Sequence, residues 1–257
     1  MPDYKPVTQS GFTPLRWTRF DSYSFAAQDM VARLVQQELP RACMTLPIAF
    51  IRDGGDFLPV ALQGLSAQTN LFVAPDGRWI GPYTPAAYRS YPFTLARTET
   101  EQMVLCVDME SGLVGEGETE DFFDDQGNPA PAVQGIVDFL TQVQNNRQAT
   151  KGLCALLERE AILTPWKITV KGREGEQVLD GLWRVDEERF NALPPDALAR
   201  LRDGGALPVI FCQLLSMQHI QTLGKLAEAR AEVSLDDPDV KSLFGDYDDD
   251  TLDFKPN

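Results

Sequence analysis

The side chains that most often carry out catalysis are sparse in this chain of 257 residues, which contains a single histidine. His219 follows Ser216 by three residues, a spacing that places both side chains on one face of a helix. A serine nucleophile would also need a carboxylate, an oxyanion hole and a sharp turn at the serine. Ser216 lies instead within an apolar run. We therefore interpret His219 as a structural or surface residue and assign no catalytic residues.

The familiar cofactor and metal motifs do not occur. The glycine pairs at 54–55 and 204–205 match neither G-x-G-x-x-G nor a phosphate-binding loop that ends in Lys-Ser or Lys-Thr. One histidine cannot form HExxH or the iron triad of two histidines and a carboxylate. We therefore predict no cofactor and no metal ligands. The cysteines form no CxxC pair, have apolar neighbours and are predicted to be buried free thiols in a reducing compartment: Cys43, Cys106, Cys154 and Cys212.

A run of carboxylates occupies residues 108–125, where eight acidic residues occur without a basic one. Dense oxygen ligands suit calcium, but the spacing does not match the twelve-residue calcium loop with its central glycine and final glutamate. A solvated loop or a contact with a basic partner is the plainer interpretation. The candidate residues of this acidic loop are Asp108, Glu110, Glu118, Asp121 and Asp124.

A proline-rich aromatic segment spans residues 79–93 and surrounds a single arginine. Arginine stacks on aromatic faces and offers a fork of donors to a carboxylate, so the segment is a candidate surface for a ligand or partner. The alternative is a proline-kinked core segment whose Arg89 binds backbone carbonyls. The candidate binding residues are Trp79, Tyr83, Tyr88, Arg89, Tyr91 and Phe93.

The elements that must position these residues follow from hydrophobic periodicity and turn residues. Strands are expected at 46–51 and 58–65 around Gly54-Gly55, and a second hairpin at 166–170 and 177–183. Helical spacing predicts helices over 25–39, 130–146, 150–163, 186–193, 196–202 and 207–228. The pattern indicates an α+β fold, with a largely antiparallel sheet and helices packed against it in a single compact domain.

Charge and composition divide the chain further. Net charge is −15, and the acidic loop together with residues 231–257 accounts for all of it. Such acidity disfavours nucleic-acid binding. We expect an extended lead-in over 1–24, a folded domain over 25–230 and an acidic tail over 231–257, whose interleaved aromatics suit a docking peptide. No window is apolar enough to span a membrane, and no signal pattern is evident, which favours the cytoplasm.

An ordered series of short segments resembles the SapC family of bacterial proteins, and the resemblance covers roughly residues 25–225. The segments lie at 46–50, 60–65, 70–73, 76–79, 83–85, 89–93, 105–108, 122–124, 133–143, 179–182 and 214–216. The family takes its name from a bacterial surface-layer locus. Some relatives have genes near those of flavin-dependent tryptophan-halogenase-like proteins and outer-membrane receptors. The resemblance implies no catalytic residue, and the acidic tail lies outside it.

These observations leave three hypotheses for function. The first is a non-enzymatic cytoplasmic accessory protein that binds a protein or peptide partner. The second is a carboxylate- or metal-dependent enzyme, or an enzyme subunit associated with the halogenase-like systems, that uses Asp108, Glu110 and Asp124. The third is a structural component of a surface layer, for which calcium-dependent self-assembly would be expected. We favour the first, because the chain lacks a recognisable catalytic constellation.

Overall fold

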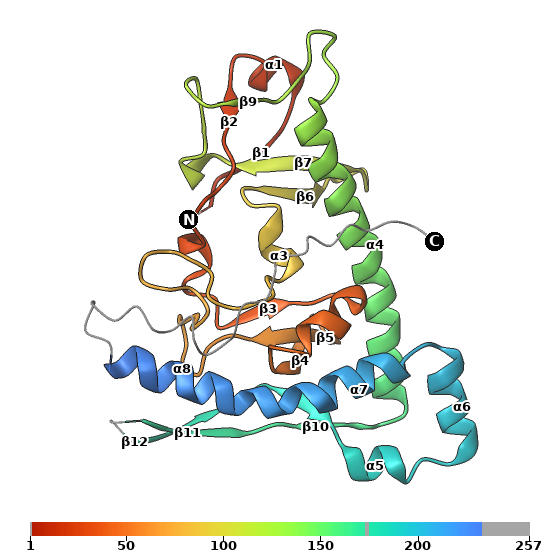
Figure 1. Cartoon of the computed structure of the whole chain (residues 1–257). Helices are drawn as coiled ribbons and strands as arrows, with labels where there is room; N and C mark the ends of the chain where they lie inside the picture. The colour runs from red at the N-terminus through yellow and green to blue at the C-terminus, as the bar shows by residue number, and fades with distance from the viewer. Residues whose placement is uncertain (1, 173–174, 233–257) are drawn as a thin grey trace.

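The structure is a computed structural model that describes residues 2–172 and 175–232. Antiparallel sheets and the helices packed on them make the fold α+β, as the sequence predicts. One long helix, α4 (Pro131–Arg159), runs along the molecule beside an upper and a lower group of strands (Figure 1). At about 1.5 Å per residue, this helix spans roughly 43 Å.

The lower sheet has five antiparallel strands in the order β10-β13-β4-β5-β3. These strands are β3 (Val31–Arg33), β4 (Ile48–Asp53), β5 (Asp56–Leu62), β10 (Leu163–Pro165) and β13 (Trp183–Val185). The predicted hairpin of β4 and β5 is confirmed. Its turn places Gly54 and Gly55 at φ angles of 59° and 95°, where any other residue would be strained.

Helix α7 (Leu207–Ser216) supplements the junction between β4 and β13, where Trp183 lies opposite Phe50. The buried side chain of Gln213 accepts from the Val185 amide at 2.9 Å and donates to the Ile48 carbonyl at 3.1 Å. Ser216 Oγ accepts from the Ile48 amide at 2.9 Å. Side chains of α7 therefore complete backbone hydrogen bonds of two strands.

The upper group of strands forms two three-stranded antiparallel sheets, β1-β7-β6 and β8-β2-β9. Their strands are β1 (Tyr4–Pro6), β2 (Arg16–Trp17), β6 (Phe93–Arg97), β7 (Met103–Asp108), β8 (Val114–Gly115) and β9 (Glu120–Asp121). The segment expected as an extended lead-in supplies β1, β2 and the short helix α1 (Gln9–Phe12). Trp17 is 2% exposed, so this segment is packed into the upper group.

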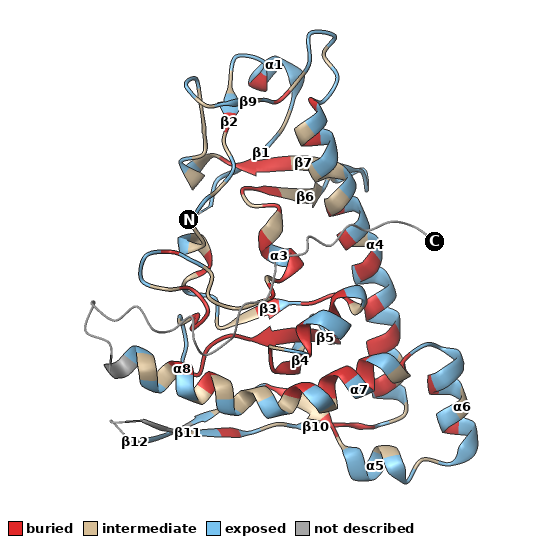
Figure 2. Cartoon of the chain, viewed as in Figure 1, coloured by how far each residue is buried: buried red, intermediate tan, exposed pale blue. Residues whose placement is uncertain are grey.

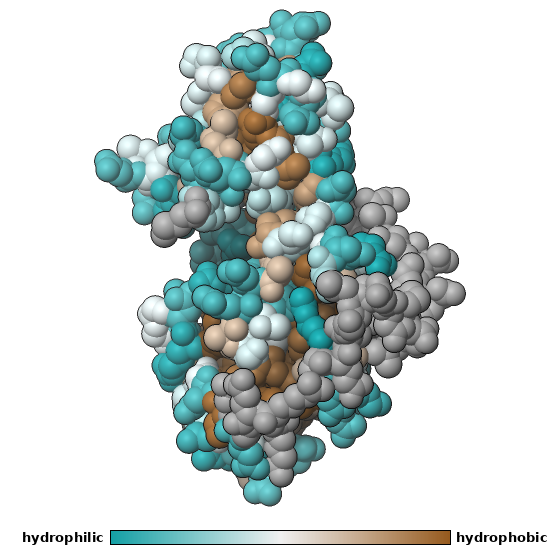
Figure 3. All heavy atoms as spheres, turned by 90° about the vertical axis from the view of Figure 1, so that its left-hand side faces the viewer, coloured by the Kyte–Doolittle hydropathy of each residue, from teal (hydrophilic) through white to brown (hydrophobic). Residues whose placement is uncertain are grey.

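Two hydrophobic cores lie one above the other along α4. The upper core includes Trp17, Phe93 and Phe122, whereas the lower core surrounds β4 and β5. Helix α4 contributes Val133 and Leu140 to the upper core, and its last turns contribute to the lower one. Figure 2 shows buried residues on the strands of both groups and along α4, and Figure 3 shows apolar side chains gathered in two regions of one face.

The two helices expected at 130–146 and 150–163 are wrong as separate elements, because α4 is continuous through residue 159. The polar run between the two apolar stripes suggested a break. Its side chains instead bind the short turn η2 (Gln36–Glu38), which lies between the cores. Asn146 Nδ2 donates to Gln37 Oε1 at 3.0 Å, and Thr150 Oγ1 accepts from the Gln36 amide at 2.8 Å.

The helix expected over residues 25–39 is also wrong. The chain there forms the turn η1 (Ser24–Ala26), the strand β3, the turn η2 and the short helix α2 (Leu39–Ala42). Pairing with β5 places Val31 opposite Leu62 and Arg33 opposite Val60. A tertiary partner outside the segment therefore overrides the helical spacing of its apolar residues.

The second predicted hairpin is confirmed as β11 (Ile168–Gly172) and β12 (Gly175–Leu179). The remaining elements are α3 (Ala86–Arg89), η3 (Met109–Ser111), α5 (Glu187–Asn191), α6 (Pro195–Asp203), η4 (Met217–His219) and α8 (Ile220–Glu232). The helix expected over 207–228 is divided at η4, next to Ser216, whose hydroxyl donates to the Gln213 carbonyl at 2.6 Å. Such back-bonding commonly bends helices.

Among the residues that the structure describes, no helix has the length and apolarity needed to cross a membrane.

Candidate functional site

The aromatic segment at 79–93 packs inward and does not form an open surface. Tyr83, Tyr88 and Phe93 are buried, and Trp79 and Tyr91 are half-buried. Their rings contact rings from the first 25 residues and from the lower core. The ring centroids are 3.8 Å apart for the stacked pair Phe25–Tyr91, 5.6 Å for Phe72–Trp79 and 4.9 Å for Trp17–Phe93.

Arg89 is bound within its own segment. Its Nε and Nη2 atoms donate to the Thr84 carbonyl at 3.0 and 2.7 Å, and its guanidinium lies 5.1 Å from the centre of the Tyr83 ring. The structure therefore brings the predicted binding residues together as a packed, hydrogen-bonded unit. This geometry matches the alternative interpretation of the segment, in which Arg89 holds backbone carbonyls.

Replacing Arg89 with alanine should lower the free energy of unfolding by about 1–2 kcal/mol, because two hydrogen bonds to one carbonyl are lost. Arg89→Lys keeps the charge but not the fork of donors, so it should recover less than half of the loss. Urea denaturation of both variants measures the effect. A loss below about 0.3 kcal/mol for Arg89→Ala would contradict a structural role.

Sequence reasoning missed a buried carboxylate at the centre of this unit. Glu38 is fully buried at the end of η2. Its Oε2 accepts from the Val35 amide at 3.0 Å, and its Oε1 accepts from the Ala86 amide at 2.6 Å and the Tyr83 hydroxyl at 2.8 Å. Burial raises the pKa of Glu38, while these hydrogen bonds and the charge of Arg89 oppose the rise. Glu38 thus joins η2 to residues 83–86.

The acidic loop does not gather its carboxylates into one site. Asp108 is buried and accepts from the backbone amides of Asp3 and Glu110 at 2.9 and 3.1 Å. Asp121 pairs with Arg16 at 3.0 Å on β2. Glu110 is exposed, and Glu118 is half-buried.

Asp124 closes a turn of its own, in which hydrogen bonds from Asn128 hold the pKa of this carboxyl below its ordinary value. Within residues 2–172 and 175–232, no group of three or more His, Cys, Asp or Glu side chains is arranged to hold a metal ion. The acidic tail, predicted as a docking peptide, lies outside the described residues apart from the end of α8.

His219 and Ser216 have separate partners. The imidazole Nε2 lies 3.0 Å from the Cys43 carbonyl oxygen, whereas the buried Ser216 hydroxyl bonds to Ile48 and Gln213. Both residues therefore have structural roles, as predicted for His219. All four cysteines are buried free thiols, which confirms that prediction.

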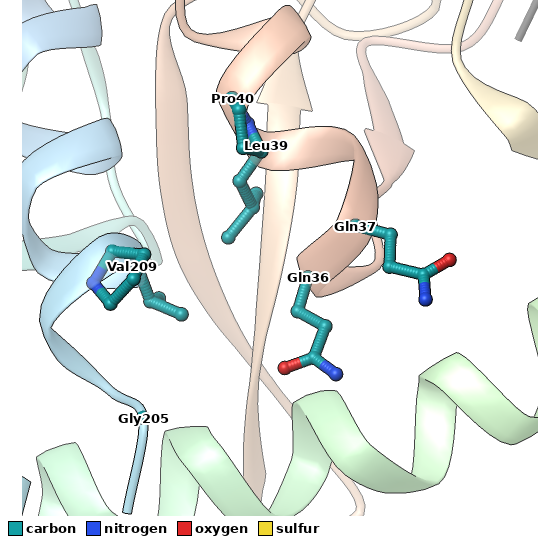
Figure 4. A pocket seen from close by; sticks show the side chains of 7 residues that line it. Gln36, Gln37, Leu39, Pro40, Gly205 and Val209 are labelled. Carbon is teal, nitrogen blue, oxygen red and sulfur yellow. The ribbon is translucent and has the colours of Figure 1, made fainter. Parts of the chain in front are cut away.

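A cavity of about 160 Å³ lies where η2 and α2 approach the start of α7. Figure 4 shows Leu39 and Val209 directed into the space between the two helices, with Gln36 beside α4. The lining combines apolar walls with two amide side chains, from Gln36, Gln37, Leu39, Pro40, Gly205, Pro208 and Val209.

Exposed apolar side chains continue from this cavity. Phe211 and Leu215, one turn apart on α7, are 49% and 62% exposed, and Met44 after α2 is 70% exposed. The Cys43 carbonyl contacts His219, one turn beyond Leu215, which places Met44 and Leu215 at the same junction of α2 and α7. We call this surface the α2/α7 face and define it as Pro40, Met44, Pro208, Phe211 and Leu215.

The sequence contains a signal for this face that periodicity alone does not use. Residues 207–216 are apolar almost all round, and Val209, Ile210 and Cys212 fill the buried side of α7. A helix packed on one side cannot bury apolar residues on every side, so some must face outward. Phe211 and Leu215 are those residues.

The comparisons with known proteins agree with this architecture. The profile of the SapC family matches residues 8–223, which span both hydrophobic cores and the α2/α7 face. Neither the curated proteins nor the solved structures include a match to the chain. Since the match covers most of the 257 residues, the chain belongs to the SapC family.

Proposed function

We propose that this protein is a non-enzymatic cytoplasmic accessory protein that binds a protein or peptide partner through the α2/α7 face. The observation that carries the proposal is the exposure of Met44, Phe211 and Leu215 beside a cavity. Exposed apolar residues grouped next to a concave site are typical of interaction surfaces. Four cysteines held as thiols are consistent with a reducing compartment.

The size of the cavity favours an amino-acid side chain over a cofactor. Its volume of about 160 Å³ is below the roughly 300–1,000 Å³ of ordinary small-molecule pockets. At roughly 30 Å³ per water molecule, it has room for about five waters, or for one apolar side chain of a partner. The amides of Gln36 and Gln37 at its edge offer both donors and acceptors to a peptide backbone.

The extent of the face favours a peptide-sized contact. A patch of a few exposed apolar side chains covers on the order of a few hundred Å², whereas a stable protein interface buries roughly 800 Å² on each partner. A helix or extended segment with two or three apolar anchors fits these dimensions. The partner proposed is therefore a short apolar segment within a larger protein.

Affinity capture from native lysate tests the proposal with matched variants. Leu215→Glu should reduce recovery of the specific partner at least tenfold, because a carboxylate would be desolvated in an apolar contact. Val178→Glu is the control, since Val178 is 56% exposed on the separate hairpin strand β12. Both variants should unfold within about 0.5 kcal/mol of the parent, because both sites face solvent.

Equal recovery by the parent, Leu215→Glu and Val178→Glu would contradict a role for this face. A partner lost equally with both variants would place the contact elsewhere.

A further inference from the structure

Two cysteines meet beneath the α2/α7 face. Cys43 caps the C-terminal end of α2, and Cys212 lies in the middle of α7. Each follows a cavity-lining residue by four positions, Leu39 on α2 and Pro208 on α7. Because a helix repeats every 3.6 residues, both thiols lie about one turn beyond the cavity along the same two helices.

The side chains of the two cysteines contact each other. The Cys212 thiol hydrogen-bonds with the Cys43 thiol, and Cys43 Sγ also donates to the Pro40 carbonyl at 3.3 Å. They are 9% and 5% exposed, so Cys212 is the more accessible of the two. Burial, followed by the neighbouring Cys43 thiol, raises the pKa of Cys212 to about 12. At neutral pH the pair is therefore two neutral thiols.

The other cysteines provide an internal comparison. Cys106 lies on β7 in the upper group of strands, and Cys154 lies on α4 with 1% exposure. Neither has a second cysteine among its described interactions. Proximity thus distinguishes Cys43 and Cys212 from the rest.

We propose that Cys43 and Cys212 form a dithiol–disulfide site that links α2 to α7 covalently when the protein meets a low-molecular-weight disulfide such as oxidised glutathione. The Cys212 thiolate attacks one sulfur of the disulfide, forms a mixed disulfide and releases one glutathione thiolate. The Cys43 thiolate then attacks Cys212 Sγ and displaces the second glutathione. Two cysteine thiols are oxidised, the disulfide is reduced to two thiols, and the two cysteine protons end on them.

The link would join the two helices that carry the α2/α7 face. Cys43 and Cys212 are 169 positions apart in the sequence, so the bond would close a long loop of the unfolded chain and raise resistance to urea. Formation of the bond does not require that the face bind a partner. Its test therefore succeeds or fails independently of the proposed function.

The test treats reduced full-length protein with oxidised glutathione, followed by alkylation under denaturing conditions and peptide mapping. The expected product has lost two hydrogens, contains a Cys43–Cys212 peptide pair and is alkylated at Cys106 and Cys154. The rate should rise about tenfold per pH unit between pH 7 and 9, because the thiolate is scarce below a pKa of about 12. The urea midpoint of this product should exceed that of the reduced protein.

Single variants separate proximity from general reactivity. Cys43→Ser should stop at one glutathione adduct on Cys212, since the resolving thiol is absent, while Cys154→Ser should still form the pair. Four alkylated cysteines after prolonged treatment of the parent would overturn the proposal. So would cross-links that involve Cys106 or Cys154 as often as Cys43 and Cys212, because these would report unfolding.

Discussion

Replacing Glu38 with alanine should lower the free energy of unfolding by roughly 3 kcal/mol, one of the largest losses expected for a single residue here. The change leaves the Val35 amide, the Ala86 amide and the Tyr83 hydroxyl buried without their acceptor. Tyr83→Phe is the matched control. It removes one of the three hydrogen bonds and should cost about 1 kcal/mol. Urea denaturation at neutral pH measures both variants.

The pH dependence of the same residue provides a second measurement. Burial raises the pKa of Glu38 in the folded protein above that of the unfolded chain, so the folded state binds this proton more tightly. Relative to Glu38→Gln, the parent should gain stability as the pH falls from neutral toward the unfolded value of about 4.3. That gain is lost as the pH rises through the folded pKa. A parent-minus-variant difference that stays flat or falls with acidification would contradict a raised pKa.

Gln148→Pro should lower the free energy of unfolding by about 3 kcal/mol or more, because proline removes a helical hydrogen bond and clashes with the preceding turn. Gln148 is exposed in the middle of α4, between the segments that enter the two cores. Gln148→Ala is the control and should change stability by no more than about 0.5 kcal/mol. Urea denaturation followed by far-UV circular dichroism compares the two.

The proline variant also distinguishes one continuous helix from the two helices that the sequence pattern suggests. A chain with a break near residues 147–149 would accommodate proline there, since the first position of a helix tolerates it. A Gln148→Pro protein as stable as Gln148→Ala would therefore reject the continuous helix.

Local signals predict the parts of this fold that depend on local chemistry. The hairpin of β4 and β5 follows from glycines that supply positive φ angles between two apolar runs. The hairpin of β11 and β12 follows from a similar pattern. The strand β3 could not be predicted in the same way, because its partner β5 is almost 30 residues further along the chain and nothing within residues 25–39 indicates it.

The candidate site was harder to predict than the fold, since its residues acquire their roles through distant contacts. Composition marks the aromatic segment, but not the direction in which its rings point. Glu38 stands between a glutamine and a leucine and resembles an ordinary surface acid. Its burial depends on Tyr83 and Ala86, more than 40 residues away. Phe211 and Leu215 are apolar residues whose exposure follows from which side of α7 meets the sheet.

The position of Gln213 determines the mechanical character of the α2/α7 face. Since its amide is bonded to both Val185 and Ile48, lifting α7 away would also separate two strands of the lower sheet. The outward side chains of α7 are thus presented on a stiff platform. A partner that docks there meets residues already held in place and loses little affinity to ordering this half of the contact.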